Sequence, residues 1–132
     1  MKNNILKFTV YLYYLILIVL LILYLYPGSI IGYLLYGDLD TQPNFVKNLS
    51  GTSINHFFYF FFLAFLGSIY NLFEKKFINS FFFLFALGIF LELTHYVVPN
   101  RAFELNDVIA NCLGVVIIYL LIKLKNFFYA KI

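Results

Sequence analysis

Four long apolar stretches constrain the fold of this chain more than any other feature. They cover residues 8–26, 54–73, 77–98 and 107–122. Each approaches the roughly 20 residues that an α-helix needs to cross a bilayer, and none alternates polar and apolar residues as the strands of a membrane β-barrel do. The 132-residue chain is 64% hydrophobic and only 11% charged, a composition that excludes an ordinary soluble domain. The sequence therefore predicts an all-α, polytopic membrane protein with four transmembrane helices in a single domain, residues 1–132.

The first apolar stretch also has features of a secretory signal peptide, because Lys2 and Lys7 precede it. Its apolar part is longer than a signal peptide requires, and no small-residue cleavage site follows. Pro27-Gly28 instead ends the stretch. We expect an uncleaved transmembrane helix.

Lysine and arginine positions predict the orientation of these helices. In the four-helix arrangement seven cations fall on one side and two on the other. Cytoplasmic loops are enriched in Lys and Arg, so we expect both termini and the turn at residues 74–76 to be cytoplasmic. The net charge is +3, but the cations lie at the ends of the apolar stretches and do not form a basic patch. We therefore expect no nucleic-acid partner. The seven are Lys2, Lys7, Lys75, Lys76, Lys123, Lys125 and Lys131, and the two are Lys47 and Arg101.

Two outward loops follow from this orientation, over residues 27–53 and 99–106. Within the first, residues 29–36 are apolar and contain two tyrosines. Tyrosine favours the boundary between membrane and water, so this segment is expected to lie on the outer interface. The single cysteine, Cys112, lies in an apolar run and is interpreted as a packing residue.

Polar side chains interrupt the third and fourth stretches close to the second outward loop. A charge near the bilayer centre costs about 2.5–3.5 kcal/mol, so such residues usually line a cavity or contact a partner. Residues three or four apart share a helix face, and the short connection between the stretches should bring the two faces together near the outer leaflet. The residues are Glu92, His95 and Tyr96 on one face, Asp107 and Asn111 on the other, Arg101 between them, and His56 at the outer start of the second stretch.

Structural roles are available for each of these side chains. Asp107 could cap a helix, Asn111 could bridge two helices, and Arg101 could neutralise an acid or contact a lipid phosphate. One ion pair would suffice for packing, whereas this set contains two acids, two histidines, an arginine and an amide. We therefore interpret the set as a site. The glycines Gly67, Gly88 and Gly114 are interpreted as points of close helix contact.

The order and spacing of these residues resemble the signature of the VanZ-like family. That signature has a Glu, a Gln three residues later, a Pro-x-Arg loop, an Asp, an Asn four residues beyond it and a Gly. His95 stands in place of the Gln and adds a titratable group, and the His56 segment lacks the Asp-Lys that the family tends to carry before its His. The matching residues are Glu92, His95, Pro99-Asn-Arg101, Asp107, Asn111 and Gly114.

The resemblance implies a small protein of the bacterial cell envelope, placed in the inner (cytoplasmic) membrane. The family takes its name from a protein associated with low-level teicoplanin resistance, and the resemblance does not imply a defined reaction.

Three functions remain open at this stage. The first is a non-enzymatic protein that binds a lipid headgroup, a lipid-linked glycan or a lipoglycopeptide. The second is an intramembrane enzyme with Glu92 or His95 as general base, and Asp107 as a further catalytic candidate. The third is a structural subunit of a homo- or hetero-oligomer. The expected ligand-binding residues are His56, Glu92, His95, Arg101, Asp107 and Asn111.

No cofactor is expected from the sequence. A Glu-x-x-His motif on a bundle helix can ligate metal, but di-iron bundles carry two such motifs and this chain has one. We therefore expect no metal site. No Gly-x-Ser-x-Gly motif and no Cys/His pair indicates a nucleophile.

Overall fold

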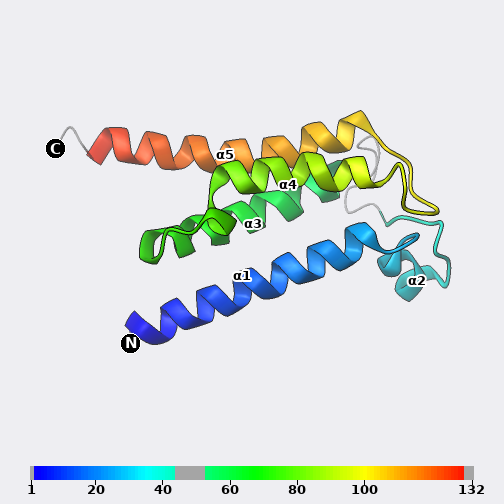
Figure 1. Ribbon diagram of the computed structural model, residues 1–132, viewed down its shortest axis with the longest axis horizontal. Coiled ribbons are helices and arrows are strands. Elements are labelled where there is room, and N and C mark those ends of the chain that lie inside the picture. The colour runs from blue at the N-terminus through cyan, green and yellow to red at the C-terminus, as the bar shows by residue number, and fades with distance from the viewer. Residues whose placement is uncertain (1, 44–52, 130–132) are drawn as a thin grey trace.

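A computed structural model of the chain describes residues 2–43 and 53–129, and the regular secondary structure of these residues is all helical (Figure 1). The expected all-α fold is therefore confirmed for this part of the chain. The helices are α1 (Lys2–Leu25), α2 (Ile30–Tyr36), α3 (Ser53–Phe73), α4 (Phe81–Thr94) and α5 (Leu105–Tyr129), with one 3₁₀ turn, η1 (Phe77–Asn79).

Three of the described helices are long and apolar enough to cross a membrane: α1, α3 and α5. The fourth apolar helix, α4, has 14 residues. At 1.5 Å per residue it is about 21 Å long, which is less than the roughly 30 Å of a bilayer's hydrocarbon core. The predicted helix over residues 77–98 is thus shorter than expected at both ends.

Local hydrogen bonds explain where α4 begins and ends. The Asn79 side chain accepts from the Lys76 N–H at 3.0 Å and donates to the Glu74 carbonyl at 2.8 Å, which holds the preceding residues in a turn. The Ser80 hydroxyl then caps α4 by accepting from the Phe83 N–H at 3.2 Å. At the other end the chain leaves the helix after Thr94, and the next three N–H groups donate to carbonyls three residues earlier instead of four, as in a 3₁₀ turn.

Other helix bounds also differ from the prediction. α1 begins six residues before position 8, at Lys2, and α5 covers Leu105–Tyr129 rather than 107–122. α2 was expected only as an apolar interfacial segment. Ser29 caps it by accepting from the Gly32 N–H at 2.9 Å, and Gly37, with φ of 73°, ends it in a left-handed conformation.

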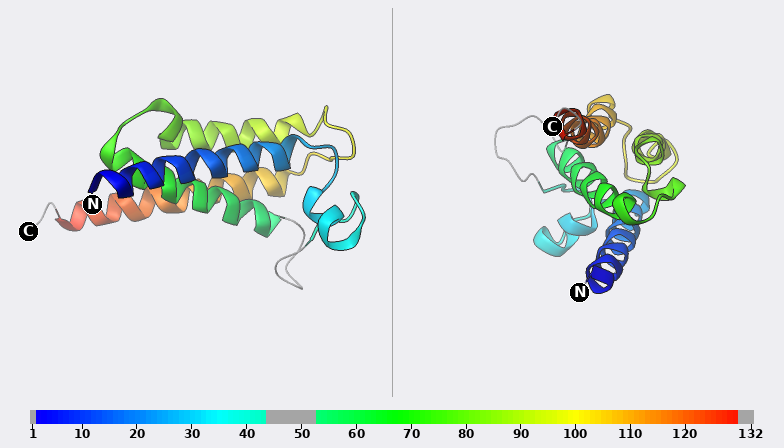
Figure 2. Two further views of the ribbon diagram at one scale, coloured as in Figure 1. Left: turned by 90° about the horizontal axis from the view of Figure 1, so that it is seen from below. Right: turned by 90° about the vertical axis from the view of Figure 1, so that its left-hand side faces the viewer.

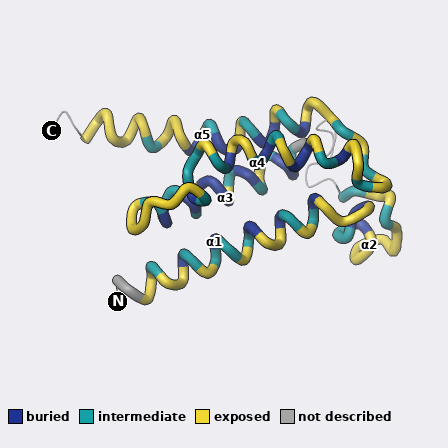
Figure 3. The backbone as a smooth tube through the Cα atoms, viewed as in Figure 1, coloured by how far each residue is buried: buried dark blue, intermediate teal, exposed yellow. Residues whose placement is uncertain are grey.

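α3 lies at the centre of the bundle and contacts α1, α4 and α5. Each helix buries one side against its neighbours and leaves large apolar residues exposed on the other, a pattern that suits a protein surrounded by lipid (Figure 3). The buried core contains Tyr13, Leu17, Leu20, Phe60, Leu63, Leu84, Leu91, Val115 and Ile118.

The two ends of the bundle differ in character. The start of α1, the end of α5 and the segment between α3 and α4 lie at one end, while α2 and residues 95–104 lie at the other (Figures 1 and 2). Six of the nine cations belong to segments at the first end, and Arg101 belongs to the second. Lys47 and Lys131 lie outside the described residues.

Gly114 allows α5 to approach α3 closely. A Cβ atom at this position would lie 2.6 Å from the Phe57 carbonyl oxygen and 2.8 Å from the Phe61 nitrogen. Both are backbone atoms, so neither can move away by a rotamer change. The interpretation of Gly114 as a helix contact is thus confirmed.

Replacing Gly114 with valine is expected to lower the melting temperature of the detergent-solubilised protein, because overpacking costs about 1–3 kcal/mol or more. The matched control is Leu113→Val, one residue earlier, where the side chain is 49% exposed. Equal melting temperatures for the two variants would contradict a close contact between α3 and α5.

Candidate functional site

A cluster of buried polar side chains lies at the end of the bundle that carries residues 95–104. All four long helices or their ends contribute to it. Glu92 and Asn111 are both 0% exposed and Asp107 is 4% exposed. The prediction that side chains from the third and fourth apolar stretches meet His56 is confirmed by the contacts below. The members, called the polar cluster from here on, are Tyr24, His56, Glu92, His95, Asp107 and Asn111.

One chain of hydrogen bonds joins α4, α5, α1 and α3. The amide nitrogen of Asn111 donates to the Gly88 carbonyl at 3.0 Å. The Asn111 side-chain oxygen therefore faces Tyr24, whose hydroxyl donates to it at 2.7 Å. The same hydroxyl oxygen lies 2.7 Å from Nδ1 of His56. Since the single hydroxyl proton of Tyr24 is used towards Asn111, Nδ1 of His56 must carry the proton that it shares with Tyr24.

Glu92 is the centre of a second group of contacts. Its Oε1 atom accepts from the Glu104 backbone N–H at 3.1 Å and from Nδ1 of His95 at 3.0 Å. Its Oε2 atom lies 3.8 Å from Nδ1 of His56 and has no hydrogen bond with any described residue. The His95 ring stacks on Tyr24 with 5.6 Å between centroids, and its buried Nε2 also has no hydrogen bond within the described part of the chain.

Asp107 completes the cluster from the first turn of α5. Its Oδ2 atom lies 3.5 Å from Nε2 of His56. His56 thus has an acidic side chain within 4 Å of each of its ring nitrogens, Glu92 near Nδ1 and Asp107 near Nε2.

Arg101 does not neutralise either acid, although the sequence allowed that pairing. Its guanidinium donates to the Leu23 carbonyl at 2.7 Å, close to the C-terminal end of α1, and forms no ion pair with a carboxylate of residues 2–43 or 53–129. A cation there also suits the negative end of the helix dipole. Burial lowers the pKa of Arg101 from its ordinary value, but an arginine stays protonated at neutral pH.

Tyr96 does not join the polar cluster. The prediction that it shares a helix face with Glu92 and His95 is wrong, because α4 ends at Thr94. Tyr96 is 70% exposed and stacks on Phe103, with ring centroids 4.8 Å apart.

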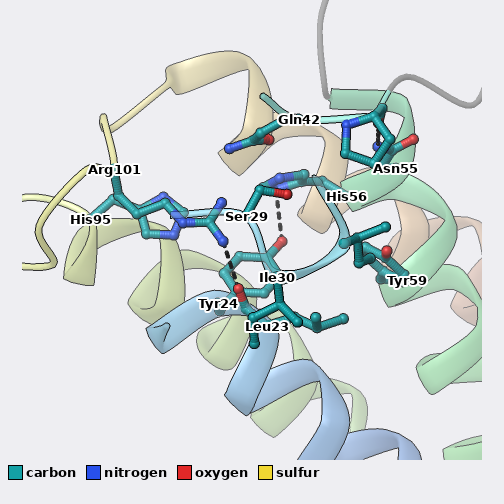
Figure 4. A pocket seen from close by; sticks show the side chains of 12 residues that line it. Leu23, Tyr24, Ser29, Ile30, Gln42, Asn55, His56, Tyr59, His95 and Arg101 are labelled. Atoms are coloured by element: carbon teal, nitrogen blue, oxygen red, sulfur yellow. Dashed lines mark hydrogen bonds between the residues drawn. The ribbon is translucent and has the colours of Figure 1, made fainter. Parts of the chain in front are cut away.

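Two adjoining cavities, of about 50 and 290 Å³, open beside the polar cluster. His56, His95, Arg101 and Gln42 line both cavities. Figure 4 shows Arg101 and His95 on one side of the first cavity and His56 on another, with Tyr24 between them.

The family is decided by a sequence comparison. The family model described as VanZ/LLP1 matches residues 10–126. The chain belongs to the VanZ/LLP1 family. Together with three helices of membrane-spanning length and hydropathy, this membership indicates a membrane protein. No curated protein and no solved structure matches the chain.

The sequence did not single out every residue of the site in this VanZ/LLP1 protein. Tyr24 was missed because it lies within a long apolar run of a chain with 12 tyrosines. A signal was present, since Tyr24 continues a buried stripe through Tyr13, Leu17 and Leu20 with spacings of four, three and four. Gln42 and the Glu104 N–H also take part, and no spacing in the sequence pointed to either.

Proposed function

We propose that this protein binds the anionic headgroup of a membrane lipid or of a lipid-linked glycan in the cavities beside the polar cluster. The observation that carries the proposal is the position of Arg101, whose guanidinium lines both cavities and forms no carboxylate ion pair in the described part of the chain. An arginine has five N–H donors in a planar fork that suits phosphate or carboxylate. Its two recorded contacts use the Leu23 and Tyr26 carbonyls, which leaves donors for a ligand.

The proposal includes a topology. Both termini and the Lys75-Lys76 turn would face the cytoplasm, and the polar cluster would face the outer leaflet of the cytoplasmic membrane. The excess of lysine at one end of the bundle supports this orientation. α4 would serve as the fourth membrane-inserted helix, with the turns after Thr94 extending it towards the outer surface.

A second candidate function is an intramembrane enzyme that acts on a lipid-linked substrate. The contact between Glu92 and Nδ1 of His95 favours it, because a carboxylate that holds one ring nitrogen orients the other for general-base work. Nε2 of His95 is buried and His95 lines both cavities. Headgroup binding remains the first candidate, since it requires only Arg101 and the cavity.

Native mass spectrometry in a mild detergent tests the binding proposal. The wild type is expected to retain a defined anionic lipid or glycolipid, and Arg101→Ala to lose it, because a charge-assisted hydrogen bond contributes about 1.5–3 kcal/mol and a tenfold change in affinity corresponds to about 1.4 kcal/mol. Arg101→Lys should bind with intermediate affinity, since a lysine lacks the planar fork.

Lys123→Ala is the matched control. Lys123 is an exposed cation over the Tyr119 ring, near the end of α5 that is far from Arg101. It should retain the same lipid as the wild type. Identical bulk lipids on all four folded proteins would contradict a headgroup site at Arg101.

A further inference from the structure

We propose that His56, Glu92 and Asp107 form a binding site for a divalent transition-metal ion. Each residue offers one ligand atom, and the three atoms all lie within 4.8 Å of one another. They come from α3, α4 and α5 and are buried. The single Glu-x-x-His motif argued against a metal at the level of sequence. The three-dimensional arrangement differs, because the two ligands that complete the set with Glu92, His56 and Asp107, come from two other helices.

The hydrogen-bond pattern around His56 prepares its ring for a cation. Nδ1 of His56 carries a proton because the Tyr24 hydroxyl donates its own proton to Asn111. In the neutral imidazole, Nε2 is then left with a lone pair, and this lone pair faces Oδ2 of Asp107 at 3.5 Å. A metal ion between or beside these two acceptors would relieve the repulsion between them, and so would a proton on either one.

Glu92 provides an independent observation. Its side chain is 0% exposed, and Oε2 is buried without a hydrogen bond among the described residues. A buried carboxylate oxygen in this state carries a large desolvation cost. Glu92 and Asp107 are thus two buried acids close to the same histidine. Arg101 does not form an ion pair with either of them, because it donates to the Leu23 carbonyl. A divalent ion would neutralise both charges at once, whereas a single proton on His56 would neutralise one.

The donor set indicates the class of metal. One imidazole nitrogen with two carboxylate oxygens suits Zn²⁺, Mn²⁺, Fe²⁺ or Co²⁺, while Ca²⁺ and Mg²⁺ prefer oxygen ligands alone. Metal–ligand bonds of about 2.0–2.2 Å in a tetrahedral site separate the ligands by roughly 3.4 Å. The His56–Asp107 pair, at 3.5 Å, already has this spacing, while the widest pair, within 4.8 Å, would draw together by up to about 1.4 Å. Three protein ligands leave a fourth position for water or a bound group, as in catalytic zinc sites.

The ligand side chains also have hydrogen bonds of the kind that orient metal ligands. The Tyr24 hydroxyl holds the non-ligating nitrogen of His56, and the Glu104 N–H and His95 hold the second oxygen of Glu92. Such contacts fix ligand orientation, and their loss typically lowers metal affinity 10–100-fold.

Cobalt titration of the full-length protein tests the site. The protein is purified in an uncharged detergent with its affinity tag removed, treated with a chelator, and titrated with Co²⁺ and then Zn²⁺. The wild type is expected to bind one Co²⁺ per chain, with visible absorption bands that Zn²⁺ removes. His56→Ala and Asp107→Asn should lose the bands. Tyr24→Phe, which keeps all three ligands, should bind Co²⁺ 10–100-fold more weakly.

Two controls separate this proposal from folding and from headgroup binding. Glu74→Gln removes an exposed acid at the opposite end of the bundle and should bind Co²⁺ like the wild type. Arg101→Ala should also keep the metal, because the site does not include Arg101. Helix content and a monodisperse elution profile verify folding. A folded wild type that binds neither ion would overturn the proposal, and so would Co²⁺ binding that His56→Ala and Asp107→Asn retain.

Discussion

Replacing Glu92 with leucine is expected to lower the free energy of unfolding by about 1–3 kcal/mol for each buried donor that is left without an acceptor. A single side-chain hydrogen bond in a membrane protein contributes only about 0.6 kcal/mol on average. Glu92 does more, because it accepts from the Glu104 N–H and from His95 and lies 3.8 Å from His56. Its loss leaves these donors buried, where water cannot replace the carboxylate.

Thermal unfolding in detergent measures this effect, with Glu104→Leu as the matched control. Glu104 is exposed, and its contact with Glu92 uses the backbone N–H, which the substitution keeps. Glu104→Leu should therefore unfold within about 0.5 kcal/mol of the wild type. If Glu92→Leu is as stable as this control, the contacts of Glu92 do not hold the bundle together.

Much of the helical architecture could be predicted because long apolar runs have few other ways to fold in a membrane. The helix predicted over residues 54–73 is α3, Ser53–Phe73. The third apolar run was misjudged because hydropathy does not report local hydrogen bonding. Asn79 and Ser80 are flanked by phenylalanine and isoleucine, yet their side chains stop one turn and cap the next helix. α2 was missed for a related reason, since it depends on Ser29 and Gly37 at its two ends.

The sequence could predict most of the residues that form the site, but it could not predict which of them contact one another. Helical spacing correctly placed Glu92 with His95, and Asp107 with Asn111, on shared faces. Spacing could not show that Arg101 would turn towards the end of α1 and contact Leu23. Nor could it pair Tyr24 with Asn111, because their hydrogen bond joins residues 87 positions apart.

The hydrogen-bond direction at Asn111 can be tested by changing one atom of the side chain. In Asn111→Asp an oxygen replaces the amide nitrogen that donates to the Gly88 carbonyl at 3.0 Å. An ionised carboxylate would then face that carbonyl, close to Glu92 and Asp107. The folded protein can avoid this repulsion only by protonating the new side chain, which also restores a donor towards Gly88.

The cost of that proton sets the expected effect. An ordinary Asp has a pKa of about 3.9, and holding it protonated at pH 7 costs about 4 kcal/mol at 1.36 kcal/mol per pH unit. The folded variant then binds one proton more than the unfolded chain, so its stability falls as pH rises above about 4. Asn126→Asp is the matched control, because Asn126 is an exposed asparagine on the same helix. The difference in unfolding free energy between the two variants should therefore widen from pH 4 to pH 7. A difference that stays constant with pH would mean that Asn111 does not donate to Gly88, and the proton assigned to Nδ1 of His56 would lose its basis.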